Sequence, residues 1–182
     1  MAAPSMSRQD RLRRVLILCC SFARNLAYYR IGRSTEYLQL QAPDRNPTFA
    51  FWRSVSGNFI DMCVLEWCKL FADKKGKHYW KNVVTNPNNF RLRLLQYLGT
   101  DETEFEKEIG IMLRYRDKFL AHLDSDLIMN IPALETAKKA VWFYYAHILA
   151  DETTNSAGLP SDINVGYART EDEARKVYQK AC

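Results

Sequence analysis

The chain has 182 residues, of which 47% are hydrophobic and 26% charged, as is ordinary for a globular protein. Its seven glycines and six prolines are few, which favours long helices over a turn-rich β fold. The net charge of +5 suits a polyanionic partner but does not identify one. The five cysteines include no CxxC pair, so their spacing fits neither a disulfide framework nor a zinc site. We expect reduced thiols, buried among apolar residues, at Cys19, Cys20, Cys63 and Cys68.

The first predicted helix follows a start, residues 1–6, that we expect to be disordered. Ser7 is a suitable cap for this helix, which runs to about Arg30. Because the apolar pattern continues beyond Arg24, we do not interpret the early apolar run as a secretory signal, and the run is too short to span a bilayer. We therefore expect a cytoplasmic chain with no membrane contact. Apolar residues recur along the helix every three or four positions, at Leu12, Val15, Leu16, Cys19, Ala23, Leu26 and Ala27.

Residues 1–33 carry nearly all of the excess positive charge. A solvated basic helix face would explain this concentration, and so would a surface that faces nucleic acid. The sequence leaves both interpretations open. The charged residues concerned are Arg8, Asp10, Arg11, Arg13, Arg14, Arg24, Arg30 and Arg33.

Two Asn-Pro pairs, at residues 46–47 and 86–87, mark helix starts, because proline is favoured at the first helical position. Residues 34–46, before the first pair, have no clear pattern, and Glu36 to Gln41 either extend the first helix or form a loop. A basic stretch, Lys74-Lys75-Gly76-Lys77, ends the helix that the first pair begins. The helices predicted in this part of the chain cover about residues 48–72, 79–84 and 88–98, and the last of them ends at Gly99.

Thr100-Asp101 opens the next predicted helix, which has carboxylates in its first turns and runs to about Leu123. Pro132 begins the last long helix. Residues 155–166 are a polar linker, and the capping box Thr170-Glu171-Asp172-Glu173 begins a short terminal helix.

These elements predict an all-α fold, an up-down bundle of four to five helices with a short C-terminal appendage. We assign residues 1–6 to the disordered start, 7–150 to the bundle, and 151–182 to the linker and the terminal helix. The chain contains no GxGxxG, P-loop, GxSxG or HExxH motif. It therefore lacks the signature motifs of dinucleotide-binding proteins, P-loop NTPases, α/β-hydrolases and metalloproteases. We expect no cofactor and no metal, because ligand spacing is lacking around the three histidines, His78, His122 and His147.

The helix from Asp101 to Leu123 holds a charged residue where an apolar one is expected. Arg116 interrupts the apolar stripe formed by Phe105, Ile109, Met112, Phe119 and Leu123. An adjacent stripe consists of Ile111, Tyr115 and His122, so Arg116 and His122 both border the packed side. Burying an unpaired charge is costly, so Arg116 needs a carboxylate, a carbonyl, water or an anion as a partner.

Two interpretations of this pair remain open. In the structural one, Arg116 reaches a buried carboxylate such as Glu66, and His122 is a satisfied histidine at a helix end. In the functional one, His122 transfers protons near neutral pH and Arg116 binds a phosphate. The two residues are separated by about 9 Å along a straight helix. They flank one phosphate if the helix ends near His122, or if a second copy of the chain supplies half of the site.

The run Arg116-Asp117-x4-His122 resembles the signature of the HEPN superfamily, and RDKFLAHLDS resembles its abortive-infection subgroup. The motif lies on a late helix of a short all-α chain, with Asp124 and Ser125 directly after it. The earlier helix, with its aromatic start at Phe51-Trp52 and its end at Phe71, is in keeping with that subgroup. The resemblance covers about residues 8–150.

The resemblance implies a metal-independent endoribonuclease, acting as a toxin or phage-defence effector, with its site shared across a homodimer. His122 would take or deliver a proton, Arg116 would stabilise charge on the phosphate oxygens, and Asp117 would orient either of them. The products would be a 2′,3′-cyclic phosphate and a 5′-hydroxyl. RNA is the implied substrate, and an antitoxin such as a minimal nucleotidyltransferase is an implied partner. The expected substrate-binding residues are Tyr115, Arg114 and Lys118, although a place in the core is the more common one for a tyrosine such as Tyr115.

Two other functions remain open. The first is a non-catalytic HEPN-like dimer that binds RNA, a nucleotide or a protein partner. The second is a structural helical bundle whose basic first helix contacts DNA or protein.

Overall fold

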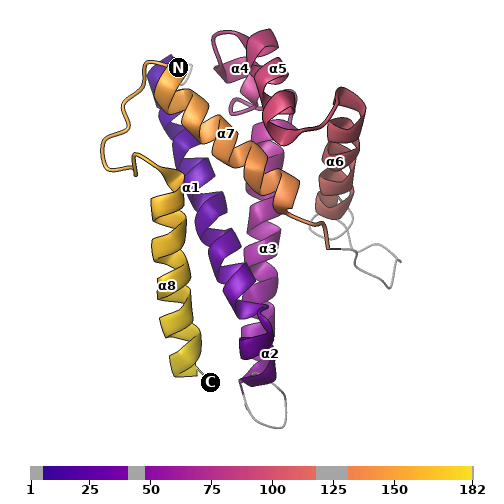
Figure 1. The fold of residues 1–182 in the computed structure, drawn as a ribbon, viewed down its shortest axis with the longest axis vertical. Coiled ribbons are helices and arrows are strands. Elements are labelled where there is room, and N and C mark those ends of the chain that lie inside the picture. The colour runs from indigo at the N-terminus through magenta and orange to yellow at the C-terminus, as the bar shows by residue number, and fades with distance from the viewer. Residues whose placement is uncertain (1–5, 41–47, 118–130, 182) are drawn as a thin grey trace, which may run out of the picture.

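The structure is a computed structural model that describes residues 6–40, 48–117 and 131–181 (Figure 1). These residues form helices and no strand, which confirms the all-α prediction. Within these ranges six helices are long and two are short, more than the four to five expected. The helices are α1 (Arg8–Gly32), α2 (Thr35–Leu40), α3 (Phe49–Phe71), α4 (Trp80–Val83), α5 (Pro87–Leu98), α6 (Glu102–Tyr115), α7 (Glu135–Asp151) and α8 (Ile163–Ala181).

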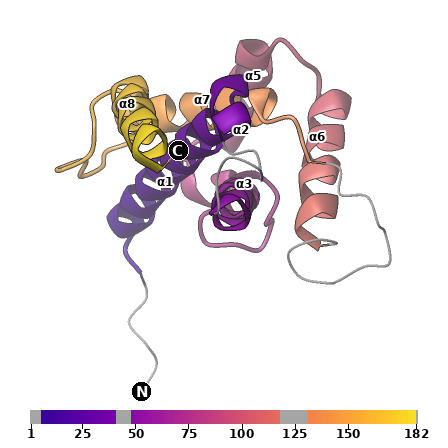
Figure 2. The ribbon, with the colours of Figure 1, turned by 90° about the horizontal axis from the view of Figure 1, so that it is seen from below.

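Helix α1 lies at the centre of the fold. Figures 1 and 2 show α3 on one side of α1 and α8 on the other, and α1 also packs on α7. Helix α6 lies at the outer edge and packs on α3. Because α1 has neighbours on three sides, its buried residues point in most directions around the helix: Leu12, Val15, Leu16, Cys19, Phe22, Ala23, Asn25, Leu26, Ala27, Ile31 and Gly32.

Helices α1 and α3 are antiparallel, and contacts along their length show the register. The thiol of Cys63 donates to the carbonyl of Phe22 at 3.7 Å. One turn and a half further along α1, the rings of Tyr28 and Phe59 stack with their centroids 5.0 Å apart. This register places the first turns of α1 beside the last turn of α3.

Three predicted helix starts are confirmed by their caps. The side chains of Ser7, Asn86 and Asp101 each accept a hydrogen bond from the backbone amide three residues later, at 3.1, 3.1 and 2.9 Å. Gly99 ends α5 as predicted, with a φ of 65° in the left-handed region that favours glycine. Residues 46–47, the other Asn-Pro pair, lie outside the described residues.

Other boundaries differ from the prediction. Residues 35–40 form the separate helix α2, which is neither a loop nor an extension of α1. Helix α7 begins at Glu135 and not at Pro132. The α-helix that Asp101 opens runs to Tyr115 and continues as a π-helical turn through residues 116–117, and the rest of the predicted helix, to about Leu123, lies outside the described residues.

The expectation of a short terminal helix is wrong, because α8 begins at Ile163 and is 19 residues long. The carboxylate of Asp162 accepts from the amide two residues later at 2.8 Å, at the point where the helix begins. Thr170 lies inside α8, and its hydroxyl donates to the carbonyl of Gly166 at 2.9 Å, so the predicted capping box does not start the helix. The helix extends further because it buries apolar side chains: Ile163, Tyr167, Ala174 and Tyr178.

The cysteines follow the expectation of reduced thiols. Cys19, Cys63 and Cys68 are buried and Cys20 is half-buried, and none of the four forms a disulfide. In the described part of the chain, every helix is too short or too polar to cross a membrane.

Gly32→Ala is expected to destabilise the protein. Gly32 is buried against α3 and α8, and an added Cβ would lie 2.9 Å from Ser56 Oγ and closer still to the hydroxyl of Tyr178. Tyr178 cannot move aside easily, because it is buried between the rings of Tyr37 and Trp52. Overpacking of this kind costs about 1–3 kcal/mol, measured as the free energy of unfolding in urea.

Gly110→Ala in α6 is the matched control. A Cβ there would contact nothing within 4 Å, so the higher helix propensity of alanine should raise the free energy of unfolding by about 0.5–1 kcal/mol. Equal stabilisation by both substitutions would show that α8 does not approach α1 at Gly32.

Candidate functional site

The last turn of α6 places Arg116 at the surface. Arg116 directly follows α6 and retains helical dihedral angles, with φ −56° and ψ −50°. Its side chain is 26% exposed. Nε donates to Oδ1 of Asp117 at 2.7 Å, and a terminal nitrogen lies 4.0 Å from Oδ1 of Asp73. The guanidinium therefore lies between two carboxylates and solvent.

The carboxylates around Arg116 keep it charged. The hydrogen bond to Asp117 raises the pKa of Arg116 above its usual value, and the charge of Asp73 adds to this effect. Both carboxylates are more than half exposed, at 56% and 55%. Exposed ion pairs of this kind contribute little stability, so an incoming anion can replace a carboxylate at modest cost.

The alternative partner considered from the sequence, Glu66, does not bind Arg116. Glu66 is buried between α1 and α3, where it accepts a hydrogen bond from Asn25 at 3.1 Å. Burial raises the pKa of Glu66, although hydrogen bonding to Ser21 and Asn25 opposes this shift. The purely structural explanation of Arg116 through Glu66 is therefore wrong.

Tyr115 fixes the end of α6 to α3. Its side chain is buried, the core placement that the sequence allowed, and its hydroxyl donates to Oδ1 of Asp61 at 2.7 Å. Burial first, and then the hydrogen bond to Asp61, raise the pKa of Tyr115 well above its usual value. The hydroxyl therefore stays protonated, and the contact orients the residue that precedes Arg116.

The thiol of Cys68, in the last turn of α3, is buried and close enough to Arg116 for the two groups to interact electrostatically. Burial raises the pKa of Cys68 to about 12, although the charge of Arg116 opposes this shift. Cys68 therefore remains a neutral thiol at physiological pH and is not an activated nucleophile.

The other predicted site residues are only partly placed. Arg114 is exposed in the last turn of α6, and Ile111, which the sequence placed on a packed stripe, is 37% exposed. His122 and Lys118 lie outside the described residues. The structure thus brings Arg114, Tyr115, Arg116 and Asp117 together at one helix end. It adds two acids that sequence reasoning missed, Asp61 and Asp73, whose positions depend on contacts between distant segments.

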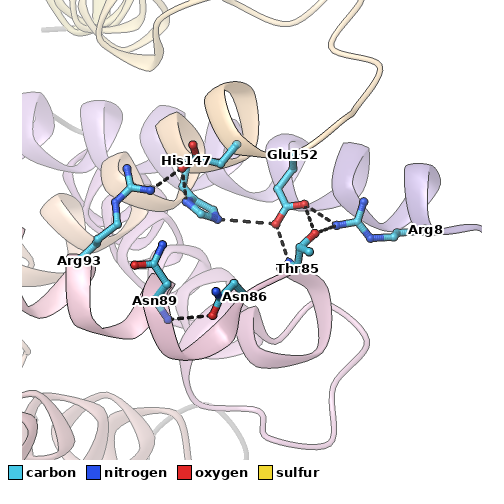
Figure 3. A network of polar contacts seen from close by, with 8 residues as sticks. Arg8, Thr85, Asn86, Asn89, Arg93, His147 and Glu152 are labelled. Atoms are coloured by element: carbon cyan, nitrogen blue, oxygen red, sulfur yellow. Dashed lines mark hydrogen bonds and ion pairs between the residues drawn. The ribbon is translucent and has the colours of Figure 1, made fainter.

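A second polar cluster, shown in Figure 3, was also missed. Glu152 follows α7, and its side chain is only 2% exposed. It accepts from the amide of Thr85 at 2.6 Å, from the hydroxyl of Thr85 at 2.7 Å, and from Arg8. Burial alone would raise the pKa of Glu152, but these donors outweigh it and hold the pKa below its usual value. We call Arg8, Thr85, His147, Asp151 and Glu152 the Glu152 cluster.

His147 lies between two acids of this cluster. Its Nδ1 is 2.8 Å from Asp151 and its Nε2 is 3.6 Å from Glu152. Burial nevertheless lowers the pKa of His147, with Asp151 and Glu152 opposing the shift. The ring packs edge-on against Phe90, with centroids 4.8 Å apart. With its side chain only 6% exposed, His147 is a packed residue that joins helices and not an exposed proton carrier.

Within the described ranges, His, Cys, Asp and Glu side chains form no group that could hold a metal ion. Comparison with protein-family models, curated proteins and solved structures finds no match to this chain.

The Glu152 cluster predicts loss of stability in acid. Because the pKa of His147 is lowered on folding, the unfolded chain binds an extra proton as the pH falls through 6.5, the ordinary value. The resulting loss in the free energy of unfolding is at most about 1.4 kcal/mol per pH unit for this one group. The pKa of Glu152 is lowered on folding, so Glu152 contributes to the free energy of unfolding above pH 4.5, the ordinary pKa of a glutamate. This contribution is lost as the pH falls below that value.

Thermal melts from pH 7.5 to pH 5 test this expectation. His147→Gln should flatten the decline between pH 6.5 and 5, but not abolish it, because burial also lowers the pKa of His78. A decline of the same steepness in His147→Gln and the wild type would show that His147 does not contribute.

Proposed function

We propose that the protein is a metal-independent endoribonuclease of the HEPN type, a toxin or phage-defence effector that acts on RNA at a site shared across a homodimer. The observation that carries the proposal is the placement of Arg116. Its guanidinium lies at the surface at the end of α6, next to exposed carboxylates and not locked to an internal acid. This is the arginine that the Arg116-Asp117-x4-His122 resemblance assigns to the phosphate.

The geometry of Arg116 suits phosphate binding. Nε is occupied by Asp117, but the nearest terminal nitrogen is 4.0 Å from Asp73, which is beyond hydrogen-bond length. Among the residues that the structure describes, the terminal nitrogens therefore have no hydrogen-bond partner and remain for a phosphate, whose oxygens match the forked donors of a guanidinium. Tyr115 and Asp61 hold the helix end in place, which limits the reorganisation that binding requires.

In the proposed reaction, the ribose 2′-oxygen forms a bond to the adjacent phosphorus, and the bond from phosphorus to the 5′-oxygen breaks. One histidine takes the 2′-hydroxyl proton and one delivers a proton to the leaving 5′-oxygen. A homodimer supplies two copies of His122, so both tasks can be served at one composite site. Arg116 stabilises the charge that develops on the phosphate oxygens. An antitoxin, such as a minimal nucleotidyltransferase, would restrain this activity in the cell.

Purified protein is expected to cleave RNA in the presence of EDTA. Arg116→Ala and His122→Ala should each reduce the rate by about 100-fold or more, the usual cost of losing a charge-stabilising donor or a proton-transfer group. Arg175→Ala is the matched control, because Arg175 is exposed on α8, far from α6 in Figure 1. Gel analysis of a labelled RNA, with detection of the 2′,3′-cyclic phosphate, provides the measurement.

RNA that stays intact with wild-type protein at high enzyme concentration would contradict the nuclease proposal. If the same protein still bound RNA, and His122→Ala bound it equally well, the non-catalytic HEPN-like dimer would be the better description. Cleavage that requires a divalent cation would contradict the metal-independent mechanism.

Mixed dimers test whether the site is shared. A dimer of one Arg116→Ala and one His122→Ala chain keeps one Arg116 and one His122, from different protomers, in the composite site, whereas each mutant homodimer lacks one of the two residues entirely. We expect such heterodimers, purified through two different tags, to regain part of the wild-type rate. Activity no higher than in either mutant homodimer would mean that each protomer needs its own arginine and histidine.

A further inference from the structure

The end of the molecule formed by the start of α1 and the end of α3 gathers cations from three segments. The antiparallel register of α1 and α3 places Arg14 beside the last turn of α3, which carries Lys69. The loop that follows α3 adds Lys77 next to His78. Arg14, Lys69 and Lys77 are all exposed. We call these three residues, together with His78, the His78 surface.

The loop that carries Lys77 is held by backbone contacts. The amide of Gly76 donates to the carbonyl of Asp73 at 2.6 Å. The side chain of Asn82 donates to the carbonyls of Lys74 and Gly76, at 3.2 and 3.0 Å. These bonds fold the loop back on itself and fix the position from which Lys77 projects.

The three cations of the His78 surface are not neutralised within the described chain. No carboxylate there lies within 4.0 Å of Arg14, Lys69 or Lys77. Three acids of the neighbouring segments have other partners. Asp10, one turn before Arg14 on α1, accepts a hydrogen bond from the hydroxyl of Ser7 at 2.6 Å. Glu66, close enough to interact with Lys69, is buried and hydrogen-bonded to Asn25, and Asp73 faces Arg116.

His78 adds no charge of its own near pH 7. Burial lowers its pKa, and the charges of Arg14, Lys69 and Lys77 lower it further. The three cations therefore lie around a neutral, half-buried imidazole. Such an arrangement leaves a positive potential that only an anion from outside can offset.

We propose that the His78 surface binds the phosphate backbone of an RNA strand and leads that strand to Arg116. Continuity with the candidate site supports this assignment, because Asp73, at the start of the loop that carries Lys77, is the residue that faces Arg116. The identity of the anion as RNA rests on the proposed function, whereas the placement of the cations does not. Each phosphate contact releases bound counterions, so the surface should confer salt-dependent affinity.

The test measures binding separately from cleavage. The probe is a fluorescent 2′-O-methyl oligoribonucleotide of about 12 nucleotides, which lacks the 2′-hydroxyl nucleophile and is within reach of a single-strand binding site. Arg14→Ala/Lys69→Ala/Lys77→Ala should weaken its affinity by about 10- to 100-fold near 0.1 M salt and reduce the slope of log affinity against log salt by about 2. Fluorescence anisotropy across a salt series gives both quantities.

The control removes the same charge from another exposed surface. Arg175→Ala/Lys176→Ala/Lys180→Ala, on α8, should leave affinity and salt slope near the wild-type values. Lys69→Arg/Lys77→Arg should also bind like the wild type, because it keeps the charges. Thermal melts check folding, and if the triple variant is unstable, Lys69→Ala/Lys77→Ala replaces it with an expected slope change of about 1.4.

Wild-type affinity in the triple variant would overturn the proposal, and so would an equal loss in the α8 control. Tighter binding of phosphatidylserine vesicles or duplex DNA than of the oligoribonucleotide would overturn the choice of RNA as the ligand. The two proposals fail separately. Binding that depends on the His78 surface, without cleavage of ordinary RNA, contradicts only the nuclease, whereas cleavage with an unchanged KM in the triple variant contradicts only the surface.

Discussion

The burial of α1 on three sides is the constraint on which the rest of the structure depends. Helices α3, α7 and α8 all pack on it, so its apolar residues cannot be confined to a single stripe. The arginines of α1 consequently lie near the ends of the helix and along the edge that remains open to solvent. Some of these arginines bind other parts of the same chain. Arg13 donates to the carbonyls of Asn155 and Ala157. Arg30 forms an ion pair with Glu135. The basic character of the first helix is therefore partly structural, and Arg14 belongs to the remainder that faces solvent.

The parts of the fold that could be predicted from the sequence are those that neighbouring residues determine. Ser7, Asn86 and Asp101 cap helices through amides three residues away, and Gly99 ends a helix through its own backbone conformation. Helix α8 could not be predicted in this way. The Thr170-Glu171 pattern satisfies local capping rules, yet the burial of Ile163 and Tyr167 extends the helix well upstream of it.

The candidate site likewise has a part that local sequence predicts and a part that only tertiary packing determines. The position of Arg116 in an apolar stripe was visible in the sequence, because helical periodicity predicts which residues border the packed side. Its partner Asp73 was not visible, since that acid comes from a loop more than forty residues earlier and has no periodic signal of its own. The same holds for Asp61, the residue that accepts the hydrogen bond of Tyr115. The acids that orient a cationic site are fixed by tertiary packing, so a motif on one helix identifies only part of the site.

The Glu152 cluster has a consequence for how the chain unfolds. Arg8, Thr85 and Glu152 come from the first turn of α1, the segment before α5 and the end of α7, so their contacts exist only when all three segments are assembled. An intermediate that lost the start of α1 would keep a nearly inaccessible carboxylate with its cation removed, which is energetically costly. Fraying of the first helix is thereby linked to separation of α7 from the rest of the bundle. The cluster thus favours cooperative, all-or-none melting over gradual opening from the N-terminal end.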